Sequence, residues 1–352
     1  MTDVVDPAAN GPAAAPELTA RDFKSDQEVR WCPGCGDYAI LAAVQGLLPE
    51  LGIPREKFVF VSGIGCSSRL PYYLDTYGMH SIHGRAPAIA TGLAIARPDL
   101  SVWVVTGDGD ALSIGGNHLI HALRRNVNLR ILLFNNRIYG LTKGQFSPTS
   151  EFGKITKTSP RGSVDHPFNP LSLAVGAGAS FAARTIASDR THLTATLRAA
   201  AAHRGTAFVE IYQNCEIFND GAFDLFVRPD SRAAWTVPLQ AGQPLRFGAH
   251  GEKGIVHDPD RFGLTVAVDP DPADVVVHDP ARDNPAYAFA LSRIGDDDGG
   301  RPTPLGVLRA VEEWPTYEEL VADQNTDAPG TDDELDALLL GRDSWIVTDR
   351  PT

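Results

Sequence analysis

Two short apolar runs with a helix-like stretch between them form the most regular pattern in the chain. Val102–Thr106 is β-branched and ends at a Gly-Asp-Gly turn (107–109), and Leu129–Phe134 ends at an Asn-Asn pair (135–136). Continuous apolar runs of this length are typical of strands that are buried on both faces of a parallel sheet. Between them, Ala111–Arg125 carries apolar residues at helical spacing. The pattern predicts a strand, a helix and a second strand parallel to the first.

Oxygen-bearing side chains follow both predicted strands. A right-handed crossover brings the carboxyl ends of the strands to one edge of the sheet, so we expect Asp108 and Asn136 to meet although 27 residues lie between them. Mg²⁺ is held by a few protein oxygens together with phosphate oxygens. We therefore predict Mg²⁺ bound by Asp108, Asn136 and the carbonyl of Ile138, with a helix that begins near Asp110 and directs free N–H groups at a diphosphate.

Further alternating elements extend this unit into an α/β fold. The predicted fold class is a doubly wound, mostly parallel sheet with helices on both faces and an irregular C-terminal extension. The predicted strands are Phe58–Val61 and Ala207–Tyr212, and the predicted helices are Ala39–Leu48, Ala88–Ala96, Leu171–Ala177 and Thr191–Ala202.

Composition divides the chain into three parts. Residues 1–20 are rich in Ala and Pro without periodicity and are predicted to be a disordered leader. Residues 21–222 are predicted to form the cofactor domain. Residues 223–352 are rich in Asp, Pro and Gly and are predicted to be an acidic interaction or capping region. Its short predicted elements are the strands Leu264–Val268 and Val275–Val277 and the helix Asp332–Leu340.

Charge and hydropathy exclude two classes of partner. A formal net charge of −13 argues against a nucleic-acid surface, whose binding depends on Lys and Arg. The sequence has neither an apolar stretch long enough for a membrane span nor a signal-peptide pattern. We therefore expect a cytoplasmic protein that binds neither nucleic acid nor membrane.

All four cysteines lie in Gly/Pro turns or at strand ends. Cys32 and Cys35 form a CxxC pair, whereas Cys66 and Cys215 stand alone. A structural zinc site, a redox pair, a [4Fe–4S] cluster and unrelated cysteines are all possible. Spacing alone does not separate zinc from iron–sulfur.

The Gly-Asp-Gly turn and the Asn-Asn pair some 25 residues later resemble the thiamine-diphosphate motif. That cofactor converts a 2-oxo acid into a decarboxylated carbanion, which needs an electron acceptor. An adjacent cluster could accept those electrons one at a time, and this favours iron–sulfur over zinc.

A closer resemblance covers about Asp22–Arg228. The motifs WCPGCGDY, GIGCSSR, HGRA, GDGDALSIGGNH and NNRIYGLTKGQ resemble those of the β subunit of 2-oxoacid:ferredoxin oxidoreductases, most like the 2-oxoglutarate type. The resemblance implies a [4Fe–4S] cluster on the four cysteines and Mg²⁺ on the residues already named. It also implies contacts to thiamine diphosphate from Ile64, Gly65, Cys66, Ser67, His83, Gly84, Arg85, Gly107, Gly109, Asp110, Gly140, Leu141 and Thr142.

Two cations in loops predicted to face the cofactor point to a dicarboxylate substrate. Arg69 and Lys143 could bind the two carboxylates of 2-oxoglutarate, Arg69 in bidentate fashion, and pyruvate has no second carboxylate. His83, beside the diphosphate, could donate a hydrogen bond or assist proton transfer. We therefore name Arg69, Lys143 and His83 as catalytic candidates.

The family resemblance implies a reaction and partners. The reaction is oxidative decarboxylation of 2-oxoglutarate with coenzyme A to succinyl-CoA and CO₂, with electrons passing to ferredoxin. A separate α subunit would supply the activating glutamate and the coenzyme A site, in an (αβ)₂ heterotetramer. The open alternatives are a pyruvate or broad-specificity enzyme, a non-oxidative thiamine-dependent decarboxylase with a zinc site, and a non-catalytic scaffold subunit.

Overall fold

The structure, a computed structural model, describes residues 18–260, 262–295, 302–325, 330–345 and 347. Most of the predicted leader, residues 1–17, lies outside the described residues. Its last residues lead into a short 3-10 helix, η1 (Ala20–Phe23), whose Phe23 is fully buried.

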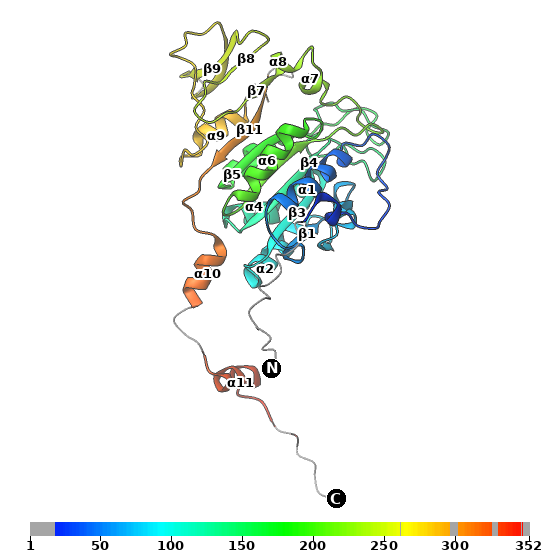
Figure 1. Cartoon of the computed structure of the whole chain (residues 1–352), viewed down its shortest axis with the longest axis vertical. Coiled ribbons are helices and arrows are strands. Elements are labelled where there is room, and N and C mark those ends of the chain that lie inside the picture. The colour runs from blue at the N-terminus through cyan, green and yellow to red at the C-terminus, as the bar shows by residue number, and fades with distance from the viewer. Residues whose placement is uncertain (1–17, 261, 296–301, 326–329, 346, 348–352) are drawn as a thin grey trace, which may run out of the picture.

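The central element is an eight-stranded sheet formed by the described residues, with strand order β2-β1-β3-β4-β6-β5-β11-β7 (Figure 1). The first six strands in this order are mutually parallel, whereas β11 runs antiparallel to β5 and β7 runs parallel to β11. In chain order the strands are β1 (Phe58–Ser62), β2 (Tyr77–His80), β3 (Ser101–Gly107), β4 (Leu129–Asn135), β5 (Phe181–Ile186), β6 (Ala207–Tyr212), β7 (Thr236–Pro238) and β11 (Thr303–Ala310).

Helices cover both faces of this sheet, because alternate side chains of each central strand point to opposite sides. In β3, Val102 and Val104 pack on one face, and Trp103 and Val105 on the other. The first face is covered by α2 (Ala86–Ala96), α4 (Gly116–Arg124), α5 (Pro170–Gly176) and α9 (Ala286–Ser292). The second is covered by α1 (Asp37–Glu50), η3 (Ser67–Tyr73) and α6 (Arg190–Ala202). The predicted doubly wound, mostly parallel architecture is confirmed.

The single helix predicted over Ala111–Arg125 is two helices. α3 (Asp108–Leu112) and α4 are separated at residues 113–115. A Cβ atom on Gly115 would lie 2.9 Å from the Cα of Gly84 and 2.4 Å from the carbonyl oxygen of Asp110. The break therefore lets the loop at Gly84, which has φ of +72°, approach the end of β3 closely.

The C-terminal part contributes to the main sheet, so the predicted division at residue 222 does not coincide with a structural boundary. β7 and β11 extend the sheet, and α9 packs on α5. A separate antiparallel sheet consists of β8 (Arg246–Phe247), β9 (Lys253–Asp258) and β10 (Gly263–Val268). The predicted strand Val275–Val277 forms only isolated bridges.

The remaining helices are short or lie at the periphery. They are η2 (Arg55–Lys57), α7 (Asp224–Val227), α8 (Arg232–Trp235), α10 (Tyr317–Asn325) and α11 (Asp332–Leu340). α11 has the bounds predicted from the sequence, and it lies apart from the sheet (Figure 1). Within the described ranges, no helix combines the length and apolar character needed to cross a membrane.

Candidate functional site

A cavity of about 620 Å³ lies at the carboxyl ends of β1, β3 and β4. The loops that follow these three strands form most of its wall, and His83, after β2, and Asp37, at the start of α1, complete it. Most of the predicted cofactor residues line it: Ile64, Gly65, Cys66, Ser67, His83, Gly107, Asp108, Gly109, Asp110, Asn136, Ile138, Gly140, Leu141 and Thr142. Ligands collect at this edge of open α/β sheets.

Asp108 and Asn136 both face this cavity, as predicted from the crossover rule. The register that pairs Gly107 with Phe134 places the ends of β3 and β4 side by side. Asn136 Oδ1 accepts a hydrogen bond from the backbone N–H of Ile138 (3.1 Å), so these two residues share one turn, and both line the same cavity as Asp108. Their oxygen donors fit a hard cation.

The Asp108 carboxylate is buried, with 2% of its surface exposed. Its Oδ2 accepts hydrogen bonds from the hydroxyls of Ser147 (2.5 Å) and Thr149 (2.6 Å). Burial raises the pKa of Asp108 to about 6, against the opposing effect of these hydroxyls. A carboxylate that is buried among neutral hydroxyls is a good ligand for a divalent ion, because the ion would replace the lost hydration.

Asp110 joins three segments around the cavity. Its Oδ1 accepts hydrogen bonds from the backbone N–H groups of Ile64 (3.1 Å) and Gly84 (2.7 Å) and lies 2.5 Å from Nδ1 of His83. Its Oδ2 accepts from the Thr106 hydroxyl (2.7 Å). The side chain of Asp110 therefore fixes the loops after β1 and before α2 relative to β3.

Gly63 and Gly109 are required by close approach. A Cβ atom on Gly63 would lie 1.8 Å from Asp110 Oδ2. One on Gly109 would lie 2.2 Å from Cε1 of Tyr139, whose hydroxyl donates to the Gly109 carbonyl (3.0 Å). These contacts explain why glycine occurs in both turns.

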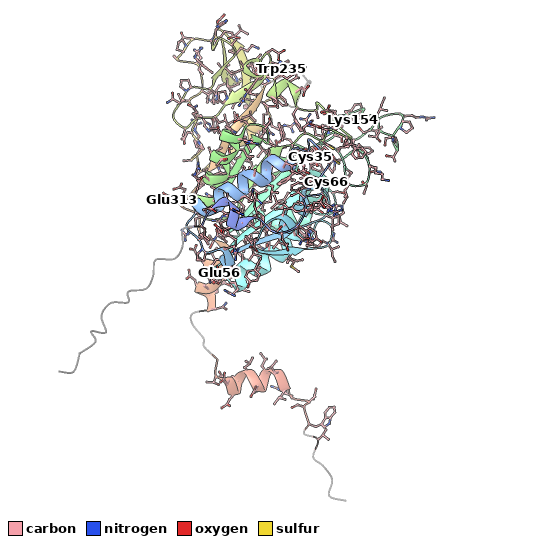
Figure 2. All side chains as sticks on the ribbon, turned by 45° about the vertical axis from the view of Figure 1, so that its right-hand side comes forward. Cys35, Glu56, Cys66, Lys154, Trp235 and Glu313 are labelled. Atoms are coloured by element: carbon pink, nitrogen blue, oxygen red, sulfur yellow. The ribbon has the colours of Figure 1, made fainter. Side chains whose placement is uncertain are left out.

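The three loops that carry cysteines are bonded to one another. The indole N–H of Trp31 donates to the Cys66 carbonyl (2.8 Å), and the Gln213 amide donates to Cys35 Sγ (3.2 Å). A Cβ atom on Gly140 would lie 3.6 Å from Sγ of both Cys66 and Cys215. Figure 2 shows Cys35 and Cys66 near the amino end of α1.

The thiol pKa values reflect this gathering. Burial, followed by the charges of Asp37 and of neighbouring cysteines, raises the pKa of Cys66 to about 12. Burial also raises the pKa values of Cys35 and Cys215. Cys66 and Cys215 raise the pKa of Cys35 further, and the exposed Cys32 raises that of Cys215. Among the described residues, however, no three Cys, His, Asp or Glu side chains are close enough around one point to hold a single metal ion.

Besides Cys32, Cys35 and Cys215, four of the predicted site residues lie outside the wall of the cavity. The exposed Lys143 lies in a tight turn with φ of +76°, and Arg69 donates its Nε–H to the Tyr73 hydroxyl (3.1 Å). Gly84 contacts the loop at Gly115, and Arg85 donates to the His83 carbonyl (2.9 Å). His83 lines the cavity.

Sequence reasoning missed three residues of this region that carry polar side chains. Ser147 and Thr149 hold Asp108, and nothing in their local pattern indicates it. Asp37 lines the cavity, is 1% exposed, and its Oδ2 has no hydrogen-bond partner among the described residues. Burial raises the pKa of Asp37 to about 7. Its place directly after the CxxC turn was a signal that could have identified it.

Comparison with known proteins assigns this chain to a protein family. Residues 63–211 match the model of the thiamine pyrophosphate enzyme C-terminal TPP-binding domain. The 2-oxoglutarate oxidoreductase subunit KorB of Mycobacterium tuberculosis is 61% identical over 334 residues, which are 93% of this chain and 88% of that protein. The chain belongs to the family of 2-oxoacid:ferredoxin oxidoreductase β subunits.

Other members of the family agree. The 2-oxoacid:ferredoxin oxidoreductase subunit beta of Saccharolobus solfataricus is 35% identical over 84% of this chain and 86% of its own length. A solved 2-oxoglutarate:ferredoxin oxidoreductase from Magnetococcus marinus, with 2-oxoglutarate, coenzyme A and succinyl-CoA bound, matches with a TM-score of 0.72 at 35% identity. The match covers 92% of this chain and 96% of that one. The predicted family and the predicted thiamine-diphosphate-binding fold are confirmed.

Proposed function

We propose that this chain is the β subunit of a 2-oxoglutarate:ferredoxin oxidoreductase. The enzyme would oxidatively decarboxylate 2-oxoglutarate with coenzyme A to succinyl-CoA and CO₂ and pass electrons to ferredoxin. The 61% identity to a 2-oxoglutarate oxidoreductase subunit, over nearly the whole of both chains, carries this proposal. The structural relative solved with 2-oxoglutarate and coenzyme A supports the same substrates.

Asp108, Asn136 and the Ile138 carbonyl would hold Mg²⁺ in this cavity, and the metal would anchor a diphosphate. When bound, thiamine diphosphate supplies the carbanion chemistry of 2-oxo acid decarboxylation. The side chain of Asp110 keeps the loops at Ile64 and His83 in place around it. Because Nδ1 of His83 bonds Asp110, its Nε2 is left to hold or donate a proton at the cavity wall.

Cys32, Cys35, Cys66 and Cys215 would hold a [4Fe–4S] cluster, which supplies single-electron transfer. The donor set fits: the sulfurs of Cys66 and Cys215 lie near Gly140, Cys35 Sγ accepts a hydrogen bond from the Gln213 amide, and Cys66 itself lines the cofactor cavity. A zinc site needs its ligands around one point, whereas a cluster binds each thiolate at a different iron. The adjoining thiamine diphosphate site favours the cluster, because a cluster can accept electrons from that cofactor one at a time.

The complete enzyme would need a partner. We infer that a separate α subunit supplies the glutamate that activates thiamine diphosphate and the coenzyme A site, in an (αβ)₂ heterotetramer in the cytoplasm. Neither Arg69 nor Lys143 lines the cavity in this chain. Both would therefore bind the substrate carboxylates only when the α subunit completes the site. Ferredoxin would accept the electrons.

Co-expression with the α subunit tests the proposal. We expect a brown complex with iron and acid-labile sulfide that reduces ferredoxin only with 2-oxoglutarate and coenzyme A, and no activity from this chain alone. Cys66→Ser should lose iron and colour. A colourless, zinc-containing complex would favour the non-oxidative decarboxylase, and a complex without thiamine diphosphate would favour the scaffold. Preference for pyruvate would refute the assigned substrate.

A further inference from the structure

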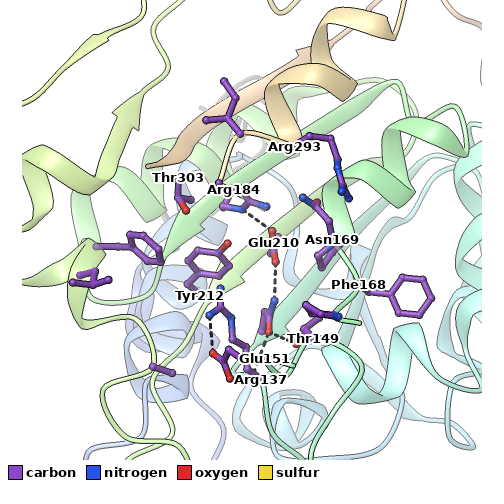
Figure 3. A pocket seen from close by; sticks show the side chains of 18 of the residues that line it. Arg137, Thr149, Glu151, Phe168, Asn169, Arg184, Glu210, Tyr212, Arg293 and Thr303 are labelled. Atoms are coloured by element: carbon purple, nitrogen blue, oxygen red, sulfur yellow. Dashed lines mark hydrogen bonds and ion pairs between the residues drawn. The ribbon is translucent and has the colours of Figure 1, made fainter. Parts of the chain in front are cut away.

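A short segment, residues 147–151, separates the cofactor cavity from a second cavity of about 850 Å³. Phe146, just before the segment, lines the first cavity, while Thr149 and Glu151 line the second. Figure 3 shows the second cavity, with Thr149 and Glu151 on one side and Arg184 and Glu210 on the sheet. Ser147 and Thr149 also bond Asp108, which lines the first cavity, so the segment connects the two sites.

On the cofactor side, two hydroxyls of the segment bind one oxygen of Asp108. Ser147 Oγ lies 2.5 Å and Thr149 Oγ1 lies 2.6 Å from Asp108 Oδ2, and all three side chains are less than 5% exposed. Each oxygen of a carboxylate has two lone-pair sites. Both hydroxyls therefore meet Oδ2, and Oδ1 is the oxygen of this carboxylate that neither of them contacts.

On the other side, Thr149 is held by a buried polar chain. Its hydroxyl lies 2.9 Å from Asn135 Oδ1, and the Asn135 amide donates to Glu210 Oε1 (2.7 Å). The other carboxylate oxygen, Oε2, accepts from Arg184 Nε (2.7 Å), within a pair that is nearly inaccessible to solvent. Figure 3 marks these contacts with dashed lines.

The orientation of the Asn135 amide is determined by its neighbours. Its Oδ1 accepts from the backbone N–H of Arg137 (3.1 Å) while its Nδ2 faces the Glu210 carboxylate. A flipped amide would place a donor against the Arg137 N–H and an acceptor against Glu210. The group behind Thr149 is therefore a fixed carbonyl oxygen that can only accept, so the one proton of the Thr149 hydroxyl can go to Asp108 Oδ2 or to Asn135 Oδ1 but not to both at once.

We propose that Thr149, with Ser147, is a positioning residue for metal binding by Asp108. Both hydroxyls would donate to the carboxylate so that one oxygen faces the cation, while Asn135, fixed by Glu210 and Arg137, packs behind Thr149 and limits the movement of its side chain. The proposal rests on the proposed Mg²⁺ site. Outer-shell partners that orient a ligand in this way typically contribute about 10–100-fold to metal affinity.

The test is a titration of the assembled αβ enzyme, stripped of metal, with Mn²⁺ in the presence of thiamine diphosphate, followed by electron paramagnetic resonance. We expect Thr149→Val to weaken Mn²⁺ binding about 10–100-fold. Thr149→Ser, which keeps the hydroxyl, should bind as the wild type does. Thr158→Val, in the exposed part of the same loop, is the matched control and should have no effect. Thermal denaturation of each variant measures stability separately.

The outcomes separate this inference from the site on which it rests. If the wild type binds no Mn²⁺ with the cofactor, the proposed Mg²⁺ site is wrong. If the wild type binds Mn²⁺ and Thr149→Val binds it equally tightly, Thr149 has no positioning role, even where its melting temperature falls. If Thr149→Val does not assemble, Ser147→Ala, which removes the other hydroxyl, decides by the same comparison.

Discussion

The buried pair Arg184–Glu210 allows a quantitative prediction. The two residues are register partners on β5 and β6, and Arg184 Nε lies 2.7 Å from Glu210 Oε2. Their side chains are 4% and 1% exposed. Glu210→Gln would remove the carboxylate charge that Arg184 Nε contacts, and loss of one partner of a buried ion pair typically destabilises a protein by about 3–5 kcal/mol.

A double-mutant comparison separates the charge from the packing. Replacing both partners by apolar residues of similar size, Arg184→Met with Glu210→Leu, removes the unpaired charge and should cost less than Glu210→Gln alone. The exposed pair Arg198–Glu50 is the control, and Glu50→Gln should change the free energy of unfolding by less than about 1 kcal/mol.

Urea unfolding of the full chain, followed by circular dichroism, measures these differences. The reasoning would be refuted if Glu210→Gln were no more destabilising than Glu50→Gln. It would also be refuted if the double substitution cost the sum of Arg184→Met and Glu210→Leu measured separately, because the charges would then be independent.

Three further predictions address the cofactor, the substrate and pH. Gly109→Ala should weaken thiamine diphosphate binding, measured by isothermal titration calorimetry, because its Cβ would lie 2.2 Å from Tyr139 Cε1 and overpacking of this kind costs about 1–3 kcal/mol. Lys143→Ala should raise KM for 2-oxoglutarate far more than KM for pyruvate, measured by ferredoxin reduction. Burial, aided by the charge of Arg130, lowers the pKa of His203 from 6.5 to about 4, so the unfolded state binds the proton more tightly. The contribution of His203 to stability should therefore fall by about 3 kcal/mol as pH drops from 6.5 to 4, measured as the difference between the urea unfolding of the wild type and of His203→Gln over this range.

Each of the three has its own control. Gly116→Ala, where a Cβ atom would meet nothing within 4 Å, should leave cofactor binding unchanged. Lys157→Ala removes an exposed lysine of the neighbouring loop and should affect neither substrate. His203→Gln should show a smaller pH dependence than the wild type. Equal effects of Gly109→Ala and Gly116→Ala, equal KM changes for both substrates, or parallel pH profiles would contradict these predictions.

Local pattern was sufficient for the central unit because its signals are short-range. The β-branched run before Asp108 and the apolar run before Asn136 correspond to β3 and β4 within a residue or two. The crossover rule then placed both side chains at one cavity. Motif resemblance supplied the family, which the comparisons confirm.

Other elements could not be read in this way because non-local contacts stabilise them. β11 contains Pro304 and Gly306, weak strand formers, yet it pairs with β5 across more than a hundred residues of chain. The buried Arg309 of β11 donates to the carbonyls of Ala179 and Arg282, contacts that no local pattern indicates. The helix after β3 breaks because Gly115 meets Gly84, which lies in another loop.

By itself, the sequence determined the strands and turns that carry Asp108, Asn136 and the cysteines, because apolar periodicity and glycine turns depend on neighbours along the chain. Tertiary structure alone decided which side chains support them. It brought Thr149 to Asp108, joined Asp110 to two loops, and left Arg69 and Lys143 outside the cavity wall. The hydrogen-bond partners of buried groups depend on which segments pack together, and these segments lie far apart in the sequence.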